Sequence, residues 1–237
     1  MLVLIPCFVG PSQAKDVLPE GLIDTLRSCR FYIAENAKTA RRFIKEACPE
    51  VVQSTLHVVE LDKHKPEEGI LDFLQPALEG NTVGLLSEAG APGVADPGAL
   101  VVAMAHKLGI LVKPLVGPSS LLLALMASGL NGQNFQFHGY LPLDASVRKK
   151  RLQELEKQNL SDHYGPTTHL FIETPYRNML LWETLVTSLS SGTRLCVAVD
   201  LTAPTEYIRT RTVEEWRKSP PESLHKRPAI FLFLAQN

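Results

Sequence analysis

The sequence predicts an α/β protein made of two α/β domains, with a mostly parallel sheet in the N-terminal domain and a mixed sheet in the C-terminal domain. Short apolar, β-rich runs alternate with helical periods along most of the chain, and this alternation favours right-handed crossovers and parallel strands. The run at 82–86 is apolar on both faces, as a sheet covered on both sides requires. The alternation resumes in the second half of the chain, after a stretch rich in turn formers at 131–146.

Five strands are expected in the first half, at 2–5, 30–34, 56–61, 82–86 and 110–115, with helices between several of them. The first run, MLVLIP, is apolar but has no basic segment before it and contains Pro6, so it indicates a strand rather than a signal peptide. A helix at 118–128 follows the fifth strand. We therefore divide the chain into an N-terminal domain, 1–117, and a C-terminal domain, 118–237.

The second half repeats the alternation of strands and helices. After a charged helix at 147–157, the pattern predicts a strand at 168–172, a helix at 176–190 and a strand at 195–199. An antiparallel pair, 206–211 with 229–234, ends the chain. Two α/β domains of similar size leave a cleft between them, and clefts between domains are favoured ligand sites, so the cofactor is expected there.

Composition and charge are those of an ordinary soluble protein, with 45% hydrophobic and 21% charged residues. The net charge of −1 argues against strong non-specific binding to nucleic acid. The four cysteines form no C-x-x-C pair, and the histidines show neither metal-site nor Ser-His-Asp spacing, which predicts no metal and a reducing compartment. The run at 121–130 is far shorter than the ~18–20 residues of a membrane span, so we expect a cytoplasmic protein without membrane contact.

The segment SEAGAPGVADPG, residues 87–98, follows the fourth predicted strand. Gly90 and Gly93 can adopt positive φ and let a ligand approach the backbone closely. Asp96 followed by Pro97 is typical of a helix start, and capping is the simplest role for Asp96. Because the loop lies at the carboxyl end of a parallel strand, where open α/β sheets bind ligands, it is a candidate binding loop.

A second loop, LVGPSS at 115–120, has the same form. Ser119 and Ser120 lie in the first turn of the following helix, where their hydroxyls and the free N–H groups either hold polar groups of a ligand or only cap the helix. Neither loop is a Walker loop or a G-x-G-x-x-G fingerprint, which argues against ATP and NAD.

The segments EAGAPGVADPG, GPSSLLLALMASGL and FQFHGYLP together resemble the tetrapyrrole methylase superfamily of S-adenosylmethionine-dependent methyltransferases. With ETPYR and VDLTAPTE in this order, the resemblance is closest to the ribosomal RNA small subunit methyltransferase I branch, which methylates a cytidine ribose 2′-hydroxyl. The first-strand turn, PCFVGPSQ, and the segment AENAKTAR depart from the pattern of that branch.

The resemblance implies a homodimer that binds S-adenosylmethionine between its two domains, largely through backbone groups. For Ile172 and Ala198, plain core packing is the alternative. The positions that match the cofactor-binding positions of the superfamily are Pro6, Gly90, Ala91, Val94, Ser120, Leu121, Ile172, Ala198, Pro228 and Ala229.

Because a ribose hydroxyl is a weak acid, a positioned carboxylate or a basic group would assist its deprotonation. Glu35, Glu88 and Glu173 are the candidates, and Glu88 alternatively is a solvated or capping carboxylate. Arg177 gains nothing from the dipole of the helix that we expect it to begin, which favours a contact with phosphate or carboxylate. The cluster RKKR at 148–151 is either a solvated helix face or a patch that contacts RNA phosphates.

Three functions remain open from the sequence. The leading one is methyl transfer to RNA, with the small ribosomal subunit as the partner. A second keeps the cofactor but methylates a tetrapyrrole or another small molecule. The third is a non-catalytic, ribosome-associated module that binds the cofactor without turnover.

Overall fold

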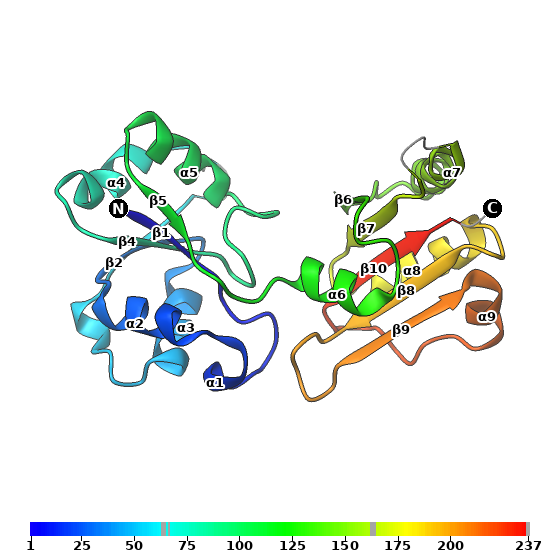
Figure 1. Cartoon of the computed structure of the whole chain (residues 1–237), viewed down its shortest axis with the longest axis horizontal. Coiled ribbons are helices and arrows are strands. Elements are labelled where there is room, and N and C mark those ends of the chain that lie inside the picture. Colours follow the sequence, from blue (N-terminus) through cyan, green and yellow to red (C-terminus); the bar gives the residue numbers. More distant parts are fainter. Residues whose placement is uncertain (63–64, 66, 162–164, 236–237) are drawn as a thin grey trace. The chain divides into compact units, whose positions relative to one another are not determined.

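A computed structural model of the chain contains two compact units, Met1–Ser119 and Ser120–Asn237, which are described separately here (Figure 1). The structure describes all residues except 63, 64, 66, 162–164, 236 and 237. None of the helices in the described part of the chain combines the length and the apolar character needed to cross a lipid bilayer. The division predicted after residue 117 stays a prediction, because compactness does not show that either unit folds alone.

Unit 1 contains the parallel sheet that the sequence predicted. Its strands have the order β3-β2-β4-β1-β5, and each neighbouring pair is parallel. Every residue of the central strand β4 is buried, as its apolar sequence requires. The five strands are β1 (Leu2–Ile5), β2 (Phe31–Ala34), β3 (His57–Glu60), β4 (Val83–Leu86) and β5 (Val112–Pro114).

Helices cover both faces of this sheet. Strand β1 shows the division, because Val3 and Ile5 pack with helices α1 to α3 whereas Leu2 packs with α4 and α5. The chain therefore leaves β1 and β2 toward one face and leaves β4 toward the other. The connections are α1 (Ala14–Val17), α2 (Glu20–Ser28), α3 (Ala37–Ala47), a 3-10 turn (Gln53–Thr55), α4 (Ile70–Leu78) and α5 (Gly98–Lys107).

Unit 2 contains the predicted mixed sheet, which confirms the α/β class of both halves. Its strands have the order β6-β7-β10-β8-β9, in which the pair β6–β7 is parallel and the other three pairs are antiparallel. Its elements are α6 (Ser120–Ser128), β6 (Phe135–Tyr140), α7 (Ala145–Ser161), β7 (Thr168–Ile172), α8 (Asn178–Ser188), β8 (Arg194–Val199), β9 (Tyr207–Thr212), α9 (Val213–Lys218) and β10 (Ala229–Leu234).

Two expectations for this sheet were wrong. The predicted antiparallel pair at the end of the chain does not exist, because β8 lies between β9 and β10 and pairs with both. Strand β6 lies within the stretch that was interpreted as turn-rich. Gly139 interrupts it with a φ of 66°, and the register shifts between Phe137 and Tyr140. Because a bulge breaks the alternation of side chains between the two faces of a sheet, the sequence pattern did not reveal this strand.

The packing of β4 makes a stability prediction for Gly84→Ala. A Cβ at this position would lie 2.8 Å from the ring of Tyr32 and 2.9 Å from Cδ1 of Ile5, and both side chains are buried. We expect a loss of about 1–3 kcal/mol in the free energy of unfolding, measured with urea. The control is Gly21→Ala in α2, where a Cβ meets nothing within 4 Å and the change is expected to stabilise by about 0.5 kcal/mol. Equal stability of the two variants would contradict this account.

Candidate functional site

Three loops of unit 1 converge beyond the carboxyl end of β4. The N–H of Cys7, after β1, donates to the carbonyl of Gly90 over 2.8 Å, and the N–H of Gly90 donates back to the carbonyl of Cys7 over 3.2 Å. The hydroxyl of Ser87 donates to the same Gly90 carbonyl over 2.9 Å. A Cβ built on Gly90 would lie 3.7 Å from the carbonyl oxygen of Pro118, so the loop after β5 is also adjacent.

The topology makes this point a favoured ligand position. Strand β4 lies between β2 and β1, and its connection runs to the opposite face from theirs. Neighbouring loops that diverge in this way leave a crevice outside the carboxyl ends of the strands, where open α/β sheets bind ligands. The segment 87–98 between β4 and α5, which we call the Gly-Pro loop, lies at this edge of the sheet.

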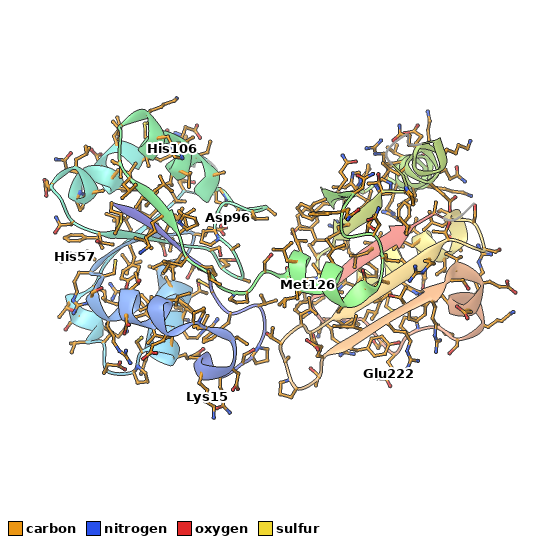
Figure 2. All side chains as sticks on the ribbon, viewed as in Figure 1. Lys15, His57, Asp96, His106, Met126 and Glu222 are labelled. Carbon is orange, nitrogen blue, oxygen red and sulfur yellow. The ribbon has the colours of Figure 1, made fainter. Side chains whose placement is uncertain are left out.

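Asp96 holds the Gly-Pro loop in shape from its place between β4 and α5 (Figure 2). Its Oδ1 accepts hydrogen bonds from the N–H of Gly93 over 2.8 Å and from the N–H of Gly98, the first residue of α5, over 2.7 Å. The second bond ties Asp96 to the start of the helix as predicted, but α5 begins at Gly98 with Pro97 in the N-cap position, one residue later than the predicted start. Gly90 and Gly93 have φ of 69° and 80°, which is the conformation that the sequence indicated.

Glu35 brings a second carboxyl group to Asp96. It follows β2, the neighbour of β4, and its side chain hydrogen-bonds the Asp96 carboxylate. Burial, this hydrogen bond and the negative charges of Asp96 and Glu88 raise the pKa of Glu35 from 4.5 to about 7, although the N–H of Glu88 opposes the shift. The structure thus places two of the three predicted carboxylates, Glu35 and Glu88, in one acid cluster with Asp96. Their catalytic role stays a prediction.

The remaining unit 1 candidates also lie on these loops. Pro6 is buried beneath the loop after β5, because a Cβ on Gly117 would lie only 2.6 Å from the Cβ of Pro6. Ala91 is half-buried and Val94 is exposed on the Gly-Pro loop. The site therefore offers backbone and small side chains beside carboxylates.

The candidates of unit 2 gather at one end of its own sheet, except for two. Ile172 ends β7 and pairs with Ile230, which also pairs with Ala198 of β8. Pro228 and Ala229 lie where β10 begins. Ser120 and Leu121 are half-buried at the start of α6. Ala198 is fully buried, as core packing also requires, so the cofactor roles of this set stay predictions.

Arg177 and Glu173, both expected near substrate, bind each other. Guanidinium Nε and Nη2 donate to Oε1 of Glu173 over 3.0 and 2.6 Å. That carboxylate is nearly buried and also accepts the N–H of Thr174. Helix α8 begins after Arg177, two residues later than predicted. The pair rigidifies the turn after β7, and a ligand contact of Arg177 stays a prediction.

The sequence analysis did not single out the ion pair between Asp200 and Arg227. Nε of Arg227 donates to Oδ2 of Asp200 over 2.7 Å, and the Thr205 hydroxyl donates to the same oxygen over 2.9 Å. Asp200 and Arg227 both line a cavity of about 560 Å³, which Tyr207 also lines. The available signal was VDLTAPTE, in which Asp200 adopts a φ of 49° at the strand end.

The basic cluster at 148–151 divides in the structure. Arg148 is buried, and its Nη1 donates to the carbonyls of Pro142 and Leu143 over 3.2 and 3.0 Å. It therefore belongs neither to a solvated face nor to a phosphate patch, because its guanidinium fixes the loop before α7. Lys150 and Arg151 border a separate cavity.

Among the described residues, no group of three or more His, Cys, Asp or Glu side chains is placed to hold a metal ion. His64 and His163 lie outside the described residues. His138 has a structural setting: its Nε2 lies 2.8 Å from Nδ1 of His169 and its ring stacks on Phe171. Burial, and then the charge of Arg151, lower the pKa of His138 to about 4, which keeps the imidazole neutral at physiological pH.

Known proteins resemble the chain both in sequence and in fold. No family model matches the chain. The chain is 30% identical over 215 residues to the ribosomal RNA small subunit methyltransferase I of Vibrio cholerae, covering 91% of this chain and 69% of that protein. It is 31% identical over 217 residues to the protein of the same name from Bacillus subtilis, covering 91% and 68%.

Solved structures share the fold at lower identity. The methyltransferase CobJ is 17% identical with a TM-score of 0.62, and the match covers 99% of this chain and 92% of that one. Uroporphyrin-III C-methyltransferase from Thermus thermophilus, in complex with S-adenosylhomocysteine, is 16% identical with a TM-score of 0.58, covering 98% and 96%.

Proposed function

Because the chain belongs to the ribosomal RNA small subunit methyltransferase I family, we propose that it transfers a methyl group from S-adenosylmethionine to a cytidine ribose 2′-hydroxyl of small-subunit rRNA. The resemblance drawn from the sequence is thereby confirmed at the level of the family. The observation that carries the proposal lies beyond β4, where the loops after β1 and β4 pair at Cys7 and Gly90 and the loop after β2 brings Glu35 into the acid cluster.

The residues at this edge suit the cofactor. Bound S-adenosylmethionine supplies an electrophilic methyl group on a positively charged sulfur. Carboxylates at Glu88 and Asp96 favour a positive charge nearby, and the effect is strongest away from bulk water. Glycine at position 90 keeps the space between the Gly-Pro loop and Pro118 free of a side chain, since a Cβ there would lie within 4 Å of both neighbouring loops.

We assign Glu35 as the general base that accepts the proton of the acceptor hydroxyl. The hydroxyl oxygen would take the methyl group as the methyl–sulfur bond breaks and S-adenosylhomocysteine leaves, and the hydroxyl proton would pass to the ionised Glu35 carboxylate. A pKa of about 7 matches this task, because the group is partly ionised at neutral pH and holds the proton well after transfer. Asp96 then accepts the hydrogen bond of the protonated Glu35.

The cofactor part of the proposal predicts the effect of Ala91→Leu. Ala91 is half-buried on the loop next to Gly90, so a leucine side chain would occupy the space assigned to the cofactor. Calorimetric titration with S-adenosylmethionine is expected to show a Kd at least 10-fold higher, at an unchanged melting temperature. The control is Ala103→Leu, on the exposed side of α5. Equal affinities of the two variants would contradict the assignment of the loop.

The acceptor rests on the sequence relatives, which are named for small-subunit rRNA. The two methyltransferases of known structure share the fold at 16–17% identity. A likeness at this level of identity does not indicate which substrate the chain uses. Label transfer to uroporphyrinogen but not to ribosomal subunits would favour the small-molecule alternative. Cofactor binding without transfer to either would favour the non-catalytic module.

We also assign the protein to a homodimer in the cytoplasm, on the strength of the family. Sedimentation equilibrium of the purified chain tests the assembly. A mass near twice 26.1 kDa is expected, and a concentration-independent monomer would overturn the assignment.

A further inference from the structure

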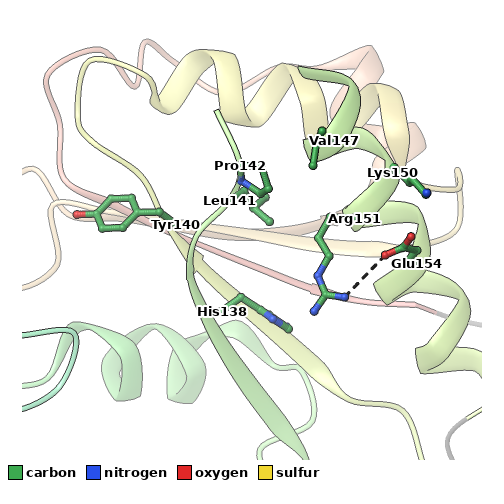
Figure 3. Close-up of a pocket in the computed structure, with 8 residues that line it drawn as sticks. All are labelled: His138, Tyr140, Leu141, Pro142, Val147, Lys150, Arg151 and Glu154. Carbon is green, nitrogen blue, oxygen red and sulfur yellow. Dashed lines mark ion pairs between the residues drawn. The ribbon is translucent and has the colours of Figure 1, made fainter. Parts of the chain in front are cut away.

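Unit 2 contains a hollow between β6 and the first turns of α7 (Figure 3). Its volume is about 370 Å³, within the range of ~300–1,000 Å³ that is typical of small-ligand sites. One side is apolar and the other carries charged groups. The lining residues are His138, Tyr140, Leu141, Pro142, Val147, Lys150, Arg151 and Glu154.

The walls of this hollow are fixed by buried or capped groups. Arg148 binds the carbonyls of Pro142 and Leu143 from behind, as described above. Oδ1 of Asp144 accepts the N–H groups of Ser146 and Val147, each over 2.9 Å, and so caps the start of α7. The shape of the hollow is therefore set before any ligand arrives, which lowers the entropic cost of binding.

Two cations stand at the rim. Nη1 of Arg151 lies 3.9 Å from the carboxylate of Glu154, and both side chains are 40–47% exposed. Such an exposed pair is worth only about 0–1 kcal/mol, so the guanidinium exchanges readily to a stronger anion. Lys150 is exposed and, among the described residues, has no acidic group in ion-pair contact. Together they suit a phosphate group.

The interior suits a flat ring. The imidazole of His138 points toward the side chain of Arg151 in Figure 3. Its ring stacks on Phe171, and its Nε2 lies within hydrogen-bond distance of Nδ1 of His169. Leu141, Pro142 and Val147 supply the apolar wall, whereas the ring of Tyr140 projects away from α7. A free phosphate would use the rim alone and leave this wall uncovered.

We propose that the hollow binds one nucleotide of single-stranded RNA, with its phosphate on Lys150 and Arg151 and its base against Leu141, Pro142 and Val147. The inference rests on the proposed function, because it deepens the RNA acceptor by naming a contact away from the acid cluster. Proteins that bind single-stranded nucleic acid combine cationic side chains that contact the phosphate backbone with a surface on which the base packs.

The test is the double variant Lys150→Ala/Arg151→Ala, compared with Lys149→Ala/Lys157→Ala. The control pair lies on the same helix, is exposed and removes the same charge, but neither residue lines the hollow. Fluorescence anisotropy with a labelled oligocytidylate is expected to show a Kd at least 10-fold higher for the first variant. The slope of log K against log salt should fall by about 0.7 in magnitude, because the variant loses its contact with one phosphate and each phosphate contact on a single strand contributes ~0.7.

Kinetics with small ribosomal subunits separate this site from the reacting centre. The KM for subunits should rise at least 10-fold in the first variant, while kcat and the Kd for S-adenosylmethionine stay unchanged. Equal losses of RNA affinity in both variants would indicate diffuse electrostatic attraction and would overturn the site. Normal RNA binding by Lys150→Ala/Arg151→Ala, with an active wild type, would also overturn it. Failure of the wild type itself to bind RNA or transfer methyl groups would overturn the proposed function along with the site.

Discussion

Replacing Glu35 by Gln is expected to lower the rate of methyl transfer by at least about 100-fold, the usual contribution of a positioned proton acceptor. The amide keeps the size of the side chain and still donates a hydrogen bond to Asp96, but it cannot take up the acceptor proton. Initial rates with a labelled methyl group measure the effect. Calorimetry on the same variant should give an unchanged affinity for S-adenosylmethionine, which separates chemistry from binding.

The same substitution should change the pH dependence of rate and stability. In the wild type the rate should rise with pH up to about 7, as Glu35 ionises, and this rise should disappear in the variant. Between its ordinary pKa of 4.5 and about 7, Glu35 is protonated in the folded chain but ionised in the unfolded chain, so wild-type stability falls as pH rises through this window. Glu35→Gln should therefore gain stability relative to wild type from pH 5 to pH 8. An unchanged pH–rate profile would remove Glu35 from the mechanism.

Asp96→Ala is expected to have the second-largest effect, because it removes the acceptor of two loop N–H groups and the partner of Glu35. The free energy of unfolding should fall by about 2–4 kcal/mol, since hydrogen bonds to charged groups contribute about 1.5–3 kcal/mol each. The pKa of Glu35 should move back toward its ordinary value, and the rise of the pH–rate profile should move to lower pH with it. Urea unfolding and the pH–rate profile measure the two effects.

Asp96→Asn is the matched control for this substitution. Its side-chain oxygen still accepts from Gly93 and Gly98, so most of the stability should return. The negative charge beside Glu35 is absent, so the pH–rate profile should stay shifted toward lower pH. An Asp96→Ala variant with wild-type stability and an unshifted profile would contradict the role given to Asp96.

The order of strands explains why the fold class could be predicted and the strand pairing could not. Alternating apolar runs identified β1 to β5 and the parallel sheet, because buried parallel strands carry their own apolar signature. Which strands become neighbours depends on tertiary contacts. The segments that form β9 and β10 are both antiparallel to β8, and nothing in their own sequences shows that β8 lies between them.

The acid cluster shows the same limit at the site. The sequence indicated Glu35 and Glu88 as carboxylates at strand ends and Asp96 as a cap. The hydrogen bond between Glu35 and Asp96 follows from the pairing of β2 with β4, which only the folded sheet reveals. Arg148 shows the opposite error, because the sequence placed it in an exposed basic cluster and the structure buries it. Its burial depends on the carbonyls of Pro142 and Leu143, in the loop after β6.

Transfer of a labelled methyl group from S-adenosylmethionine to small ribosomal subunits, isolated from a bacterium that lacks its own family member, tests the central claim most directly. The account predicts label in the rRNA, released as 2′-O-methylcytidine on nucleoside analysis, and none with Glu35→Gln. Absence of label in RNA from a wild-type protein that binds S-adenosylmethionine, or label on a base atom instead of the ribose, would contradict it.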